Sequence, residues 1–188
     1  MINRVIRAAM LDGAFFKEAE ADISLNQEAL MVVILVSLAG SIGTFIGGVM
    51  GGEIGSALLG LIAALVTGVV TYYIWAYVTY FVGTKLFNAE VDPGELLRVL
   101  GYASGPRALS ILSFIPCVGW IVAFAGGVWS LIAGFIGARE ALDLDTTKTL
   151  ITIVIGWIII MIVTAVVMAV LGVGAAGAGA LGSLLGGG

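Results

Sequence analysis

Arg107 is the residue whose type and position give this sequence its clearest capacity for chemistry. It stands in an apolar stretch, directly after Gly101-Tyr102-Ala103-Ser104-Gly105-Pro106. An ionisable group at membrane depth marks a functional site by default, and a guanidinium suits an anionic lipid or solute. The structural interpretation is that Arg107 snorkels to headgroups or pairs with Glu95. The candidate site for a lipid or a partner comprises Gly101, Tyr102, Pro106 and Arg107.

Other kinds of chemistry are excluded by composition. The 188-residue chain has no histidine, which removes Ser-His and Cys-His catalysis and imidazole metal sites. The single cysteine, Cys117, cannot form an intramolecular disulfide or a thiolate cluster. The net charge of −4 and the lack of a basic run argue against nucleic acid. We therefore expect no enzyme, no metal and no cofactor.

The elements that position Arg107 must lie in a membrane. Hydrophobic residues make up 61% of the chain, which also has 28 glycines. The tracts 29–83, 108–138 and 149–188 contain one charged residue between them, Glu53. Apolar tracts of this length cross a bilayer as helices, because a helix satisfies its own backbone hydrogen bonds. The sequence predicts an all-α integral membrane protein with the lipid bilayer as its surroundings.

A five-helix transmembrane bundle is the predicted architecture. Asp92-Pro93-Gly94-Glu95 has the pattern of a helix start, with the first turn at Pro93. Pro106 lacks an amide hydrogen, so the third span should kink at Gly105-Pro106. Residues 93–138 either cross twice or form a re-entrant hairpin, and the pattern leaves both open. The spans are expected at about 29–48, 54–83, 96–116, 119–138 and 149–172.

Charge sets the predicted orientation. In the five-span arrangement seven basic residues share one side, which the positive-inside rule assigns to the cytoplasm. The N-terminus is then cytoplasmic, and 173–188, almost all Gly, Ala and Leu, forms an exoplasmic tail. The seven residues are Arg4, Arg7, Lys17, Lys85, Arg98, Arg139 and Lys148.

Residues 1–28 form a predicted cytoplasmic segment with short amphipathic helices. One apolar pattern contains Ile2, Ile6 and Met10, and a second contains Phe15 and Phe16. Such helices can lie on the headgroup layer with their apolar faces inserted. They can equally pack against the underside of the bundle.

Small residues recur at four-residue spacing along the spans. This spacing places them on one helix face, where backbones can approach closely in lipid. The face can serve packing within the chain or a homo-oligomer. The candidate packing positions are Gly43, Gly47, Gly60, Gly68, Gly126 and Gly134.

Several features together resemble the Yip (Ypt/Rab-interacting protein) family. They are the form GYxxxP at Gly101-Tyr102 to Pro106, the turn Ile115-Pro116-x-x-Gly119-Trp120, and a short Asp/Thr/Lys loop before the fifth span. The resemblance covers about 15–170 and implies a five-helix membrane domain. In eukaryotic relatives it implies a cytosolic N-terminus that engages prenylated small GTPases, partner family members and membrane-shaping proteins in vesicle traffic.

Two departures argue against binding of a small GTPase. The cytosolic N-terminus is only 1–28, and the DLxGP-type motif of eukaryotic relatives is absent. The compact form is similar to prokaryotic members, which predicts a multi-pass protein of a prokaryotic cell membrane.

The leading functional hypothesis is a non-enzymatic scaffold or adaptor in membrane organisation or trafficking-like processes. It would act through helix packing, as a homo-oligomer or with a protein partner at its cytoplasmic face. The alternative is a conduit for a small solute, a lipid or an ion, lined by the kinked third span and Arg107.

Overall fold

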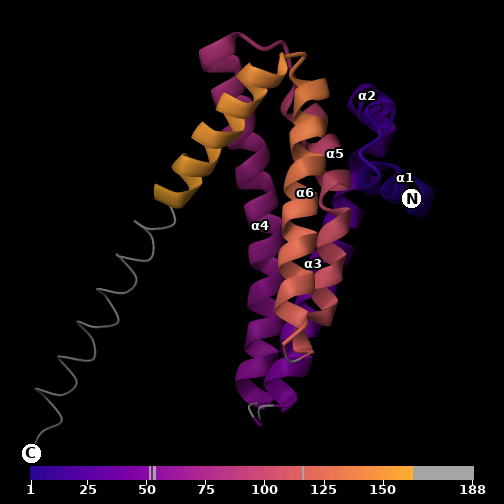
Figure 1. Cartoon of the computed structure of the whole chain (residues 1–188), viewed down its shortest axis with the longest axis vertical. Helices are drawn as coiled ribbons and strands as arrows, with labels where there is room; N and C mark the ends of the chain where they lie inside the picture. The colour runs from indigo at the N-terminus through magenta and orange to yellow at the C-terminus, as the bar shows by residue number, and fades with distance from the viewer. Residues whose placement is uncertain (51, 53, 116, 163–188) are drawn as a thin grey trace, which may run out of the picture.

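The computed structural model describes residues 1–50, 52, 54–115 and 117–162, and these residues form helices and no strand (Figure 1). The all-α prediction is therefore confirmed for this part of the chain. The predicted tail, 173–188, and residues 163–172 of the predicted fifth span lie outside the described residues. The elements are α1 (Ile2–Ala9), α2 (Gly13–Ala21), η1 (Ile23–Leu25), α3 (Asn26–Met50), α4 (Ile54–Phe87), α5 (Pro93–Ala103), η2 (Gly105–Phe114), α6 (Gly119–Ala141) and a helix Thr146–Ile162.

Three helices within the described residues are long and apolar enough to cross a membrane. They cover Ile23–Met50, Leu58–Phe87 and Gly119–Ala141. The shortest has 23 residues and so reaches about 34 Å, more than a hydrocarbon core of about 30 Å. They coincide with the predicted first, second and fourth spans, and mark the chain as a membrane protein.

The predicted third span, 96–116, is two helices placed end to end. α5 begins at Pro93, as expected, and the amide of Asp92 donates to Glu95 Oε2 at 3.0 Å. After Ala103 the chain changes to η2, a 3₁₀-helix of 10 residues, whereas such helices rarely exceed three or four. α5 and η2 together are about 36 Å long, although neither could cross alone. A bundle of five spanning helices stays a prediction.

The helices form two antiparallel hairpins that pack side by side. α3 and α4 make the first, α5–η2 and α6 make the second, and η2 lies against both α3 and α6. Figure 1 shows the η2–α6 turn at the end of the bundle remote from α1 and α2. The second hairpin thus runs along most of the bundle. This is the length that residues 93–138 would need in order to cross the membrane twice.

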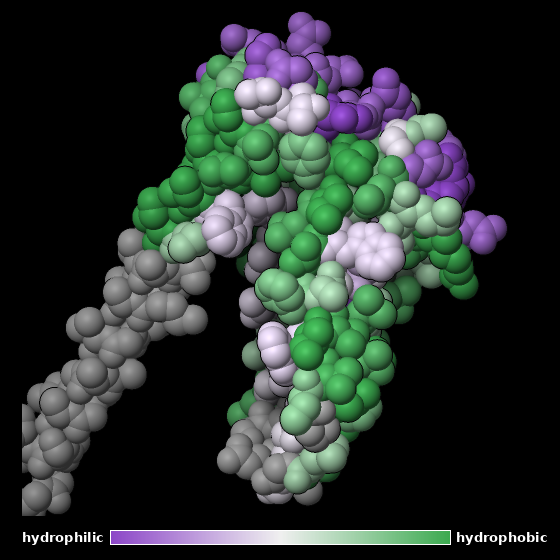
Figure 2. All heavy atoms as spheres, in the orientation of Figure 1, coloured by the Kyte–Doolittle hydropathy of each residue, from purple (hydrophilic) through white to green (hydrophobic). Residues whose placement is uncertain are grey.

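Charged side chains of the described residues gather toward one end of the molecule. Figure 2 shows this hydrophilic end in purple above a largely apolar shaft. We call it the charged end; it is made by α1, α2 and the segments 88–95 and 139–148. Six of the seven basic residues assigned to one face form ion pairs or hydrogen bonds there: Arg4, Arg7, Lys17, Arg98, Arg139 and Lys148.

The buried core lies next to the charged end. Phe15 and Phe16 of α2 are fully buried against α5 and α6, so α2 packs on the bundle instead of lying free on the headgroups. α1 keeps an exposed apolar face, with Ile2, Ile6 and Met10 at 70%, 50% and 73% exposure. α2 therefore packs on the bundle, whereas insertion of the apolar face of α1 into the headgroup layer stays a prediction.

Candidate functional site

The GYxxxP segment occupies the junction between α5 and η2, where α1, α3 and α6 approach it. A Cβ on Gly101 would lie 2.9 Å from Ala29 Cβ and 3.0 Å from the Ala29 carbonyl oxygen in α3. A Cβ on Gly105 would lie 2.7 Å from Val5 Cγ1 in α1. Both glycines thus permit contacts that any larger residue would obstruct.

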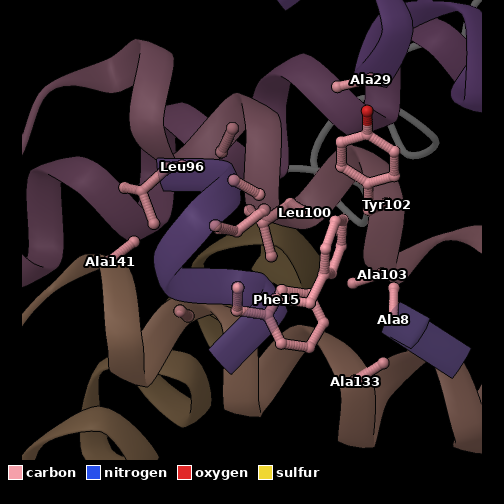
Figure 3. Close-up of a cluster of buried hydrophobic side chains, with 14 of the residues drawn as sticks. Ala8, Phe15, Ala29, Leu96, Leu100, Tyr102, Ala103, Ala133 and Ala141 are labelled. Carbon is pink, nitrogen blue, oxygen red and sulfur yellow. The ribbon is translucent and has the colours of Figure 1, made fainter. Parts of the chain in front are cut away.

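Tyr102 joins the two N-terminal helices to the bundle. Its side chain is fully buried, and its ring meets Phe15 of α2 edge to face, with centroids 5.0 Å apart. Figure 3 shows the hydroxyl directed toward α3 near Ala29. The hydroxyl lies beside Glu28 without reaching hydrogen-bond geometry. Glu28 in turn holds Arg4 of α1 at 2.7 Å.

The helix break at Pro106 is stabilised from α6. Because proline has no amide hydrogen, it cannot donate to the Ala103 carbonyl three residues earlier, as a 3₁₀ turn would require. The amide of Arg107 donates instead to the Ser104 carbonyl at 2.9 Å. The Ser130 hydroxyl of α6 donates to the Ala103 oxygen at 2.8 Å. The four-residue spacing of small residues includes Ser130, between Gly126 and Gly134, but it does not predict this hydrogen bond, which depends on a contact across 27 residues.

Arg107 directly follows this junction and has no carboxylate partner within the described residues. Its side chain is exposed to a cavity of about 430 Å³ between the helices. None of the ion pairs in the described part of the chain involves it, and Glu95 instead caps α5. The interpretation that pairs Arg107 with Glu95 is therefore wrong, because the carboxylate is already used at the start of α5.

Arg98 is the functional residue that sequence reasoning missed. It is 4% exposed, and its Nε donates to the Ala19 carbonyl at 2.8 Å while a terminal nitrogen donates to the Glu20 carbonyl. The other terminal nitrogen donates to Asn26 Oδ1 at 3.0 Å. These carbonyls end α2, where helices leave acceptors unpaired and favour a cation. Arg98 therefore attaches α2 to the start of α3.

A signal for Arg98 was present in the sequence. Arg98 precedes Tyr102 by four residues, which places both on one face of α5. Gly94 lies one turn earlier, and a Cβ there would be 3.3 Å from Arg98 Nη1. The shared face suggests that Arg98 and Tyr102 have a common role. The positive-inside rule used Arg98 only to assign the orientation of the chain.

Comparison with known proteins identifies the family. The family model described as Yip1 domain matches residues 12–168, from α2 through most of the chain. The chain belongs to the Yip1 domain family. No curated protein and no solved structure matches the chain. The resemblance stated from the sequence is thereby confirmed.

Three of the six candidate packing glycines make tight contacts within this Yip1 domain. A Cβ on Gly43 of α3 would lie 2.7 Å from the Ser110 carbonyl oxygen of η2. On Gly126 of α6 it would lie 2.7 Å from the Pro106 carbonyl oxygen. On Gly68 of α4 it would overlap the Ser37 side chain. These three glycines let helix backbones meet in lipid, where close packing replaces the hydrophobic effect.

The other three candidate packing glycines are less constrained. A Cβ on Gly134 would make an ordinary contact with Leu100 Cδ2 at 3.6 Å. On Gly47 and Gly60 it would meet no atom of the described residues within 4 Å. Packing among the described residues therefore does not account for Gly47 or Gly60.

Carboxylates around Glu20 give the charged end of the Yip1 domain its electrostatic character. Partial burial, followed by the nearby charges of Asp143, Glu95 and Glu140, raises the pKa of Glu20 to about 7. Lys17 opposes this shift and pairs with Glu140 at 3.6 Å. No three metal-ligating side chains of the described residues are grouped to hold an ion. The arrangement of the described residues thus docks α1 and α2 on the bundle.

Proposed function

We propose that this membrane protein of the Yip1 family is a non-enzymatic scaffold or adaptor in membrane organisation or trafficking-like processes. The observation that carries the proposal is the docking of α1 and α2 on the GYxxxP junction. These helices are held in one position by four residues: Gly101, Gly105, the buried Tyr102 and the buried Arg98. Such rigid attachment presents a defined surface to a partner instead of a flexible tail.

The proposed partner surface is the charged end, which we assign to the cytoplasm by the positive-inside rule. The compact form of the domain favours a prokaryotic cell. Exposed acids surround it: Glu18, Glu90, Asp92, Asp143 and Asp145. A surface of this charge favours a basic protein partner, because complementary charge speeds and orients encounter. Homo-oligomerisation is a further proposal, and the unoccupied space at Gly47 and Gly60 is consistent with it.

Site-specific photocrosslinking in native membranes tests the scaffold. The crosslinker replaces Glu18 on α2, and a matched control replaces Ile62, a 60% exposed apolar residue of α4. We expect one recurrent adduct from position 18, lost when Arg98→Ala releases α2 although the chain remains in the membrane. Recovery of monomer alone from position 18 would contradict the proposal.

A conduit is the second candidate function, and the cavity at Arg107 is the observation that favours it. Flux of small anions into liposomes would be measured with the native chain and with Arg107→Ala. A conduit predicts flux that changes with the substitution. Absence of flux from both proteins removes this candidate and leaves the scaffold.

A further inference from the structure

The cavity beside Arg107 has the composition of a site for an amphiphile. Its volume of about 430 Å³ falls within the usual range of ligand pockets, about 300–1,000 Å³. The wall is largely apolar and comes from α3, α4, α5, η2, α6 and the helix Thr146–Ile162. Arg107 contributes the single charged side chain to the lining. The one charge and the apolar wall fit a ligand with an anionic head and a hydrocarbon tail.

Three hydroxyl groups that line the cavity with Arg107 already donate within the protein. The Tyr72 hydroxyl already donates to the Leu97 carbonyl at 2.6 Å, and the Ser130 hydroxyl donates to the Ala103 carbonyl. The Ser104 hydroxyl donates to the Gly101 carbonyl at 2.6 Å. A hydroxyl has one hydrogen to donate, so these three groups can only accept further bonds. The guanidinium carries five N–H donors and matches a phosphate.

The depth of Arg107 matches the head of a membrane lipid. η2 begins at Gly105, where Val5 of α1 packs against it. Arg107 lies two residues further, about 4 Å along a 3₁₀-helix. α1 carries Arg4 and Arg7, and the Trp129 indole donates to the Ala9 carbonyl at 2.7 Å. Arginines and a tryptophan at this level are typical of the membrane interface, not of the bilayer centre.

The cavity opens sideways toward lipid. Its lining includes Phe124 and Val128 of α6 and Trp157 of the helix Thr146–Ile162, which are 67%, 40% and 54% exposed. Figure 2 shows a hollow between this helix and the bundle. An acyl chain can leave the cavity there and rejoin the bilayer, whereas a free anion would leave the apolar wall uncovered.

We propose that this cavity binds one anionic phospholipid from the leaflet at the charged end. Its phosphate contacts Arg107, and an acyl chain passes between α6 and the helix Thr146–Ile162. The lipid supplies the counter-charge that no carboxylate of the described residues provides. This inference is independent of the scaffold proposal, since a bound lipid requires neither a partner nor flux.

Native mass spectrometry of the full chain tests the proposal. The chain is reconstituted into phosphatidylcholine vesicles with a minor share of phosphatidylglycerol, extracted in mild detergent, and its retained lipid is measured. We expect phosphatidylglycerol to be enriched on the native chain. Arg107→Gln should reduce this enrichment about tenfold or more, the loss expected for a hydrogen-bonded ion pair. Lys85→Gln, which removes a charge at the end of α4, should leave the enrichment unchanged.

A second variant tests the apolar part of the site. Gly127 lines the cavity, and a Cβ there meets no atom of the described residues within 4 Å. Gly127→Leu should therefore fold, fill the cavity and lower retention of both phospholipids while Arg107 remains. Circular dichroism and gel filtration check the fold of each variant, and if Arg107→Gln does not fold, Gly127→Leu decides.

Three results would overturn the proposal. The first is equal enrichment of phosphatidylglycerol on the native chain and on folded Arg107→Gln. The second is unchanged retention by Gly127→Leu. The third is displacement of the lipid by soluble glycerol phosphate, which would show that Arg107 binds a free anion and that the apolar wall contributes nothing.

Discussion

The charged end and the opposite end of the bundle are held together in different ways. At the charged end, aromatic rings are fully buried, ion pairs join α1 and α2 to the spans, and Arg98 links three helices. At the opposite end, Leu59, Ile62 and Val66 of α4 are 72%, 60% and 56% exposed. Gly47 and Gly60 there meet no neighbour of the described residues.

The difference follows from the solvent on each side. Next to water, burying Phe15 and Phe16 is favourable because apolar surface leaves water. In lipid the surroundings are as apolar as the side chains, so outward-facing leucines and isoleucines cost nothing and helices associate through small residues. We infer that α2 and its contacts supply most of the tertiary stability, and four substitutions test this.

Phe16→Ala should have the largest effect. The Phe16 ring is fully buried, and its Cδ1 lies 3.0 Å from where a Cβ on Gly137 would be. Removing a buried ring costs about 3–5 kcal/mol of unfolding free energy. Chemical unfolding in detergent measures the loss, and Phe81→Ala, which truncates a 58% exposed ring on α4, should change little. Equal losses in the two variants would show that the charged end is no more important than the lipid-facing shaft.

Arg98→Ala should lower the stability of the α2 attachment by about 3 kcal/mol, since three acceptors lose the donors of a buried guanidinium. Proteolysis within residues 1–25 should become faster. Arg98→Lys should restore only part of the protection, because one ammonium does not reproduce the planar fork. Arg139→Ala, which breaks a partly exposed ion pair with Glu140, should lower the stability by less than about 1 kcal/mol. Similar proteolysis in both alanine variants would contradict the role of Arg98.

Gly101→Val and Gly60→Val form a matched pair of glycine substitutions. Gly101 lies in the junction next to the charged end, and Gly60 lies at the opposite end of the bundle. A Cβ at Gly101 would press on the backbone of Ala29, so overpacking should lower the free energy of unfolding by about 1–3 kcal/mol. The same change at Gly60 meets open space and should be close to neutral. Thermal unfolding of the two variants gives the comparison. A larger loss at Gly60 would reveal a contact with a second copy of the chain.

Glu20→Gln should have the smallest effect, visible as a change in pH dependence. The pKa of Glu20 is raised from 4.5 to about 7, so the folded state holds this proton more tightly than the unfolded state. The contribution of Glu20 to stability is therefore most favourable below pH 4.5 and becomes less favourable as pH rises to about 7. Glu20→Gln should abolish this part of the fall in unfolding temperature. Glu90→Gln, an exposed carboxyl at the same end, is the control, and an identical native profile in Glu20→Gln would contradict the prediction.

Particular residues show what the sequence could predict about the fold. The start of α5 at Pro93 followed from Asp92 and Glu95, because a capping box is a local interaction. The long apolar helices followed from tracts without charge. The change to a 3₁₀-helix over ten residues could not be read from Pro106, since it depends on how η2 packs between α3 and α6.

The candidate site was predictable to a smaller extent. The GYxxxP segment and Arg107 stood out because of their residue types within an apolar stretch. The hydrogen bonds of Arg98 and Ser130 could not be predicted, because their partners lie 79 and 27 residues away. A hydroxyl or guanidinium acquires its role from the carbonyl it reaches, and that carbonyl is set by packing.

By itself, the sequence determined that this chain is a membrane protein and where its apolar helices lie. It also determined which charged residues cluster at one end and which family the chain resembles. These properties depend on hydropathy, charge and helix caps, each of which can be recognised within one or two helical turns of the sequence. Tertiary structure alone decided that α2 docks on the bundle, that Arg98 is buried and Arg107 is not, and that a lipid-sized cavity lies beside Arg107. Those properties depend on contacts between segments far apart in the chain, which no local pattern specifies.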